Sequence, residues 1–326
     1  MACTGFFLVL LARWLDLKQL REAAEGTDPL LFLASLILWM LLPAVAAVRL
    51  RVLMGPSTMD LHVPRLCRVQ YIALFYGLFL PAGVGSSIAR WAKVAKDATA
   101  RIQFAYITIV EKFLLIAVAL AAVGLPLLLS KDERIAPLRQ AFLPIFWISS
   151  VASPAFIVFL LSQRFHDLLI GVVQRVATAI RLPILNRIAK SLSLDLFAGR
   201  YRELAISVGI TLVIQGLMLL RMVCMFRAVG VDLAWTTALW VGTVTFLIQV
   251  LPISFAGIGV RESTFAYVFS LYGLAPEAGA LVGLYSLVHI FANAALGGIL
   301  ELTDKGNEPT GDGTDGAKNK SAPPGD

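Results

Sequence analysis

The chain has 326 residues, of which 58% are hydrophobic and 15% charged, and its mean hydropathy is +0.80. This composition is too apolar for a soluble globular domain and indicates an integral membrane protein. The net charge of +7 does not indicate nucleic-acid binding, because the basic residues punctuate apolar runs and form no continuous stripe. We interpret them as topology signals and contacts with lipid headgroups.

The first apolar run, 2–12, is about half as long as the roughly 20 residues that a membrane-spanning helix needs. No basic residue precedes it and no small-x-small cleavage site follows it, so the pattern does not predict a signal peptide. We expect a truncated first helix or a translation start placed too late.

Five further runs are long and apolar enough to cross a bilayer. They are 29–48, 102–130, 142–163, 204–226 and 278–300. Two of these predicted spans contain charges, Glu111 and Lys112 in one and Arg221 in the other, which only the interior of a helix bundle would tolerate. In the last span, Gly279-x-x-x-Gly283 offers a small-residue face for close helix packing. That motif is too common to indicate an oligomer.

Two more charge-free runs, 69–89 and 233–260, are broken in the middle by proline and glycine. The first reads Leu-Pro-Ala-Gly-Val-Gly-Ser-Ser-Ile-Ala-Arg over 80–90, and the second reads Leu-Pro-Ile-Ser-Phe-Ala-Gly-Ile-Gly-Val-Arg over 251–261. Each places an arginine nine residues after the proline. Leu-Pro occurs six times in the chain, but only these copies add a Gly-x-Gly pair and the arginine. The pattern predicts an internal repeat of a broken membrane helix.

Such breaks free polar backbone groups at membrane depth, and transporters use paired breaks to direct half-helix N-termini at an anionic substrate. We expect Ser86 or Ser87 and Ser254 to cap the helices that restart after the breaks. With Arg90 and Arg261 they would form two anion-favouring pockets. The alternative is that Pro81 and Pro252 only kink ordinary spans, while the arginines extend to the interface.

The predicted orientation follows from charge. The amphipathic loop 164–202 carries seven basic residues and should be cytoplasmic. Alternation then places the two broken hairpins on opposite faces as re-entrant segments of an inverted repeat, with the C-terminal tail cytoplasmic. The expected fold is therefore all-α and polytopic, with about six spans plus two re-entrant hairpins, or about eight spans. Residues 1–303 form the membrane domain, and 304–326, rich in Gly and Pro, form a disordered polar tail.

The short list of site residues follows from these patterns. The predicted lipid- or anion-binding residues are Arg90, Arg261, Glu262, Ser86, Ser87 and Ser254. The predicted intramembrane polar support comes from Glu111, His289, Asn293 and Gln249, and the backbone breaks from Pro81, Gly83, Gly85, Pro252, Gly257 and Gly259. For Arg261 the alternative is a salt bridge to Glu111 or Glu262 that only locks the bundle. For Glu111 we favour structural pairing, and for His289 a packing role over a proton relay.

The stretch 74–90, the Glu111-Lys112 pair and the stretch 251–262 resemble the lysylphosphatidylglycerol synthase transmembrane domain family over roughly 1–303. The second motif departs from the family pattern at Ala256, where glycine is common. The first departs at Ser86 and Ser87, near positions where the family often has Gly and Asp. The resemblance implies an inner-membrane module that moves lipids, such as aminoacylated phospholipids, hopanoids or polyprenyl-linked sugars. It also implies a stand-alone member, because the family's soluble aminoacyl-transferase domain has no counterpart in the polar tail.

We therefore predict a flippase-like protein of the cytoplasmic membrane that translocates or transfers a lipid or lipid-linked headgroup. The alternatives are a membrane-embedded lipid-modifying transferase and an accessory subunit with a cytosolic or membrane biosynthetic partner. The sequence contains none of the metal, phosphate-loop or nucleophile motifs of common enzymes, so we predict no enzyme activity, no cofactor and no metal. The sequence names neither the lipid nor the oligomeric state.

Overall fold

The computed structural model describes residues 17–55, 61–79, 84–94, 98–129, 132–161, 200–250 and 257–303. Within these ranges all regular structure is helical, which confirms the predicted all-α class. The elements are α2 (Leu17–Glu25), α3 (Pro29–Met54), α4 (Val63–Gly77), α5 (Val84–Val94), α6 (Ala98–Leu129), the 3₁₀ turn η2 (Glu133–Ile135), α7 (Ala136–Leu161), α10 (Tyr201–Ala228), α11 (Trp235–Val250), α12 (Val260–Leu271) and α13 (Pro276–Leu302). The predicted half-span 2–12, most of the loop 164–202 and the tail 304–326 lie outside the described residues.

The described parts of all five predicted spans lie in long helices. Four of them are long and apolar enough to cross a membrane: Pro29–Met54, Gln103–Leu129, Tyr201–Ala228 and Pro276–Leu302. The fifth lies in α7, whose 26 residues reach about 39 Å at 1.5 Å per residue. Leu33, Ile37 and Leu41 form a stripe along α3, yet they are 49%, 51% and 47% exposed. An outward apolar stripe of this kind is typical of a lipid-facing surface, and together with the four candidate spans it makes the chain a multi-pass membrane protein.

The first long span extends further than its apolar run predicts. The run ends at Val48, but α3 continues to Met54 and so carries Arg49 and Arg51. At its start, Asp28 is the N-cap and accepts hydrogen bonds from the backbone N–H groups of Leu30 and Leu31. The helix continues past Arg49 because that charge is paired inside the bundle, as described below.

The two broken runs form pairs of short helices, α4 with α5 and α11 with α12. After α4, the N–H of Leu78 bonds the carbonyl of Phe75 in a tightened last turn. Before α12, Gly257 and Gly259 have φ of 75° and 86°, values that favour glycine and interrupt a right-handed helix. Pro43 and Pro126, by contrast, lie inside continuous helices. A Leu-Pro pair alone therefore does not break a helix in this chain.

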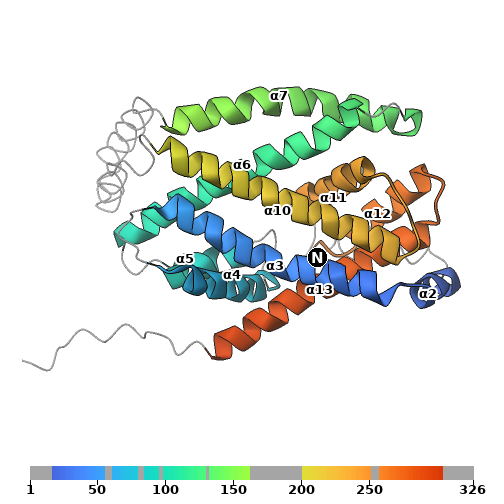
Figure 1. The fold of residues 1–326 in the computed structure, drawn as a ribbon, viewed down its shortest axis with the longest axis horizontal. Helices are drawn as coiled ribbons and strands as arrows, with labels where there is room; N and C mark the ends of the chain where they lie inside the picture. Colours follow the sequence, from blue (N-terminus) through green and yellow to red (C-terminus); the bar gives the residue numbers. More distant parts are fainter. Residues whose placement is uncertain are drawn as a thin grey trace, which may run out of the picture.

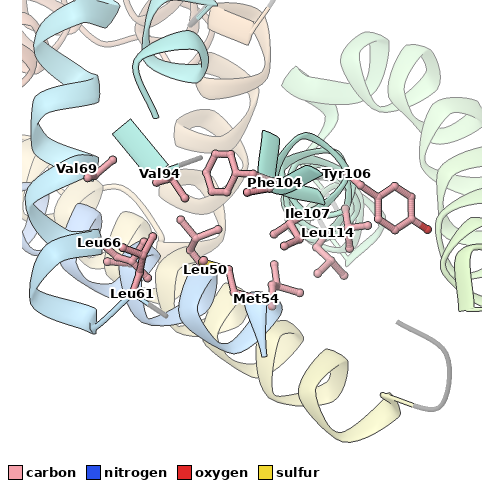
Figure 2. Packing of buried hydrophobic residues seen from close by; sticks show 14 of the residues in the cluster. Leu50, Met54, Leu61, Leu66, Val69, Val94, Phe104, Tyr106, Ile107 and Leu114 are labelled. Atoms are coloured by element: carbon pink, nitrogen blue, oxygen red, sulfur yellow. The ribbon is translucent and has the colours of Figure 1, made fainter. Parts of the chain in front are cut away.

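The long helices run along the longest axis of the molecule, and the two short pairs lie toward opposite ends of it (Figure 1). Each pair has its own apolar core. One cluster joins α3, α4, α5 and α6 around Leu50, Leu66 and Phe104, as Figure 2 shows. The other joins α6 and α10–α13 around Phe226, Phe265 and Phe269. The two broken segments therefore pack in separate halves of the helix bundle.

Helix α13 packs against both halves through glycines. A methyl group on Gly283 would lie 2.7 Å from Cα of Glu262 in α12, and one on Gly297 would lie 2.0 Å from the carbonyl oxygen of Tyr71 in α4. Gly279 approaches the backbone of Phe265 in the same way. The small-residue face predicted at Gly279 and Gly283 is thus used inside the chain, where it brings α12 and α13 into backbone contact.

Replacement of Gly283 by alanine is expected to lower the free energy of unfolding by about 1–3 kcal/mol, because the added methyl group overlaps backbone that cannot move aside. Gly216→Ala in α10 is the matched control, since no atom outside its own stretch of helix lies within 4 Å of the point that its methyl group would occupy. That control should be neutral or slightly stabilising, as alanine favours helix. Thermal unfolding of the two variants in one detergent measures the difference. Equal stability would contradict the close contact.

Basic side chains gather at one end of the bundle. At one end Arg200 donates to the carbonyls of Val52 and Leu53 at the end of α3. At the same end Arg68 donates to the carbonyl of Leu300, and Lys93 pairs with Glu301 at 2.7 Å, so α4 and α5 hold the C-terminus of α13. The start of α10 and the ends of α3 and α13 therefore share one basic end.

Candidate functional site

The arginine of the first broken segment belongs to a buried three-residue ion cluster. Arg90 in α5 donates to one carboxylate oxygen of Glu111 in α6 at 3.0 Å, and Arg49 in α3 donates to the other at 2.7 Å. The three side chains are buried, and Arg49 also donates to Thr211 of α10 at 3.2 Å. Two guanidinium groups share one carboxylate, so the cluster carries a net charge of +1.

Arg49 is a member of this cluster that sequence reasoning missed. The sequence predicts an interfacial position for Arg49, because the apolar run 29–48 before it already has the length of a span. The sequence signal that points to Arg49 is Glu111, because a carboxylate inside a predicted span needs a cationic partner at membrane depth. Structural pairing of Glu111, the preferred interpretation, is present in the structure.

The arginine of the second broken segment lies in a separate cluster. Arg261 is 2% exposed; it pairs with Glu262 at 2.9 Å and donates from Nε to the carbonyl of Gly283 at 3.1 Å. The second oxygen of Glu262 accepts the backbone N–H of Gly259 at 2.7 Å. Glu262 thereby caps the N-terminus of α12 and holds Arg261 at the break. Of the two predicted salt-bridge alternatives, the structure contains the pair with Glu262.

The predicted serine caps are not found where the structure can test them. Ser86 and Ser87 lie inside α5, which is already helical at Val84 and Gly85, so neither residue occupies an N-cap. The cap position of α12 belongs to Gly259. Ser254, Pro81, Gly83 and Pro252 lie outside the described residues. The prediction for Ser86 and Ser87 was wrong because α5 begins at Val84, two residues before Ser86.

His289 in α13 connects three helices. Its Nδ1 lies 3.3 Å from Nη1 of Arg221 in α10, and its Nε2 lies 3.3 Å from the hydroxyl of Ser35 in α3. A guanidinium only donates, so Nδ1 accepts and Nε2 carries the proton. Ser35 in turn donates to the carbonyl of Phe32 at 2.7 Å. Both ring nitrogens are therefore occupied, as the packing interpretation of His289 requires.

Asn293, one turn further along α13, repairs the backbone of α3. Its amide donates at 3.3 Å to the carbonyl of Trp39. That carbonyl lies four residues before Pro43, which has no N–H to donate to it. Asn293 thus stabilises a proline-containing helix at membrane depth. Gln215 donates to Thr243 at 2.7 Å and joins α10 to α11, whereas the side chain of Gln249 lies outside the described set.

Arg90 and Arg261 thus lie in separate clusters, and α10 supplies the buried polar side chains of Thr211 and Arg221. Thr211 contacts the Arg90 cluster and Arg221 contacts His289 near Arg261. These two α10 positions are ten residues apart, or about 15 Å along the helix axis. Among the described residues no three His, Cys, Asp or Glu side chains group as a metal site would require. For the chain as a whole, the absence of a metal site stays a prediction, because this finding covers the described residues alone.

Comparison with known proteins identifies a family. Residues 2–297 match the family model described as the lysylphosphatidylglycerol synthase TM region. The match covers both broken segments and both buried ion clusters. No curated protein and no solved structure matches the chain.

Proposed function

From the premise that this chain belongs to the lysylphosphatidylglycerol synthase TM region family, we propose that it translocates a lipid with an anionic headgroup across the membrane. The family consists of membrane domains that act in lipid modification or translocation. The finer assignment to translocation is supported by the two halves of the structure, each with a broken helix pair.

The observation that carries the proposal is the pair of buried arginines, Arg90 and Arg261, one from each broken segment. The Arg90 cluster holds two arginines for one carboxylate, whereas Arg261 pairs with Glu262 and keeps one guanidinium nitrogen without a partner among the described residues. A buried positive charge in a helix bundle surrounded by lipid is costly unless a partner neutralises it. A phosphate group on a lipid headgroup is suited to this role because it accepts hydrogen bonds from guanidinium groups in a fork geometry.

The proposed location is the cytoplasmic membrane, with the basic end of the bundle in the cytoplasm. Arg68, Lys93 and Arg200 lie at that end, as the positive-inside rule demands of a cytoplasmic face. The C-terminus of α13 lies there too, so the tail that follows it would be cytoplasmic. Ser86, Ser87, Ser254 and Glu262 remain proposed contributors to the two anion-binding regions.

The test is a leaflet-resolved lipid assay with a total lipid inventory. Purified protein is reconstituted into vesicles that carry fluorescent phosphatidylglycerol, and a membrane-impermeant reductant quenches the outer leaflet. Translocation predicts that quenching exceeds the half expected for a static bilayer, whereas protein-free vesicles stop at half.

The inventory separates translocation from chemistry. Cells with and without the protein should differ in the leaflet distribution of their lipids while containing the same lipid species. A new or missing species would instead indicate a membrane-embedded transferase. Vesicles that stop at half quenching for every lipid class, together with co-purification of a biosynthetic enzyme, would indicate an accessory subunit.

A further inference from the structure

The most unusual charge in the described part of the chain is Arg221, about three quarters of the way along α10. It is 7% exposed, and the described residues provide no carboxylate that bonds it. Its Nη1 lies 3.1 Å from the sulfur of Met225, its Nη2 lies 3.2 Å from the sulfur of Met222, and its guanidinium stacks over Trp39 at 4.6 Å. Arg49 and Arg90, by contrast, both bond Glu111.

These neutral partners leave the cation poorly satisfied. Thioether sulfur is a weak acceptor, and the Nε of Arg221 has no partner within the described residues. His289 supplies one imidazole acceptor. Burial of a cation among such groups has a desolvation penalty, which an apolar side chain at the same position would not have.

A second guanidinium with an unused donor lies nearby. Arg261 donates to the carbonyl of Gly283, which lies six residues, or about 9 Å, before His289 on α13. Its Nη1 has no hydrogen-bond partner among the described residues. The carboxylate of Glu262 bonds Arg261 and the N–H of Gly259, and among the described residues no bond joins it to Arg221. The group therefore has two guanidinium ions, one carboxylate and free N–H donors on each arginine.

We infer that Arg221 and Arg261 together form an oxyanion site for the phosphate of a lipid headgroup. Guanidinium groups match phosphate oxygens in charge and geometry, and Met222 and Met225 are flexible side chains that can yield to a stronger acceptor. The inference rests on the proposed function and deepens it, because it assigns the headgroup a position between α10, α12 and α13.

The test measures binding separately from translocation. Wild type, Arg221→Met and the control Arg227→Met are purified in a phosphate-free detergent. Arg227 lies six residues further along α10, is exposed and pairs with Asp232. Thermal unfolding is followed against dihexanoyl phosphatidylglycerol, inorganic phosphate and dihexanoylglycerol, which has no phosphate. The phosphatidylglycerol should stabilise wild type and Arg227→Met, and Arg221→Met should bind it about tenfold or more weakly.

The outcomes separate the inference from the proposed function. If inorganic phosphate stabilises wild type but not Arg221→Met, the result also supports the oxyanion site and assigns it to free phosphate. Equal affinity of Arg221→Met and wild type for phosphatidylglycerol, or equal stabilisation by dihexanoylglycerol, overturns the inference while any lipid translocation by wild type still stands. If phosphatidylglycerol binding is lost in Arg221→Met but the wild-type protein moves no lipid in vesicles, the result supports the site and contradicts the proposed function.

If Arg221→Met does not fold, Arg221→Lys provides the comparison with Arg227→Lys. Lysine keeps the charge but loses the fork of donors, so the affinity for phosphatidylglycerol should fall several-fold only in Arg221→Lys. Unchanged affinity in that variant overturns the inference.

Discussion

Replacement of Glu111 by glutamine is expected to lower the free energy of unfolding in detergent by about 3–5 kcal/mol. The substitution keeps the shape of the side chain but leaves the guanidinium groups of Arg49 and Arg90 buried without a carboxylate. Urea or thermal unfolding followed by circular dichroism measures the loss. Glu22→Gln is the control, since Glu22 is exposed and its carboxylate lies 3.9 Å from Lys18, and its effect should be below about 1 kcal/mol.

A triple variant separates the stability of this cluster from its function. Arg49→Met, Arg90→Met and Glu111→Met together remove all three charges, and such apolar replacement of a buried ion cluster is often neutral or stabilising. We expect the triple variant to unfold near the wild-type midpoint but to lose lipid translocation. Translocation at the wild-type rate would show that Arg90 only stabilises the bundle.

The second large effect is expected at Arg261. Arg261→Met should reduce the rate of lipid translocation by about 10- to 150-fold, equivalent to the 1.5–3 kcal/mol that a hydrogen bond to a charged group contributes. The vesicle quenching assay provides the rate, and membrane fractionation shows whether the variant inserts. Arg227→Met should move lipid at the wild-type rate.

Loss of Arg261 also leaves Glu262 buried and unpaired, which would destabilise the chain by itself. The double variant Arg261→Met with Glu262→Gln avoids this, because the glutamine oxygen still accepts the N–H of Gly259. If the double variant folds as wild type does and moves lipid at the wild-type rate, Arg261 has no part in headgroup binding.

Local signals in the sequence predicted much of the architecture. The five apolar runs became long helices, since the length of a charge-free run is a local property that bilayer thickness selects. The breaks were found because proline and two nearby glycines act on the backbone at their own positions, and the φ values of Gly257 and Gly259 confirm the second one. The family resemblance is confirmed over residues 2–297.

The predictions were wrong where a contact between distant residues overrode a local sequence preference. The serine caps were predicted from residue type, yet Ser86 and Ser87 lie within α5 and Glu262 provides the carboxylate at the start of α12. Val48 was expected to end the first span, because an arginine normally ends an apolar run. Glu111, 62 residues away, allows α3 to continue past Arg49.

By itself, the sequence determined that this chain is an all-α membrane protein, where its spans lie and where two of its helices break, because each of these depends on composition within about 20 residues. Only the tertiary structure decided which partner each buried charge has. Glu111 serves Arg49 and Arg90, Glu262 serves Arg261, and Arg221 contacts His289, 68 residues away, without a carboxylate among the described residues. Those pairings depend on how the helices rotate and pack against one another, which no local pattern specifies.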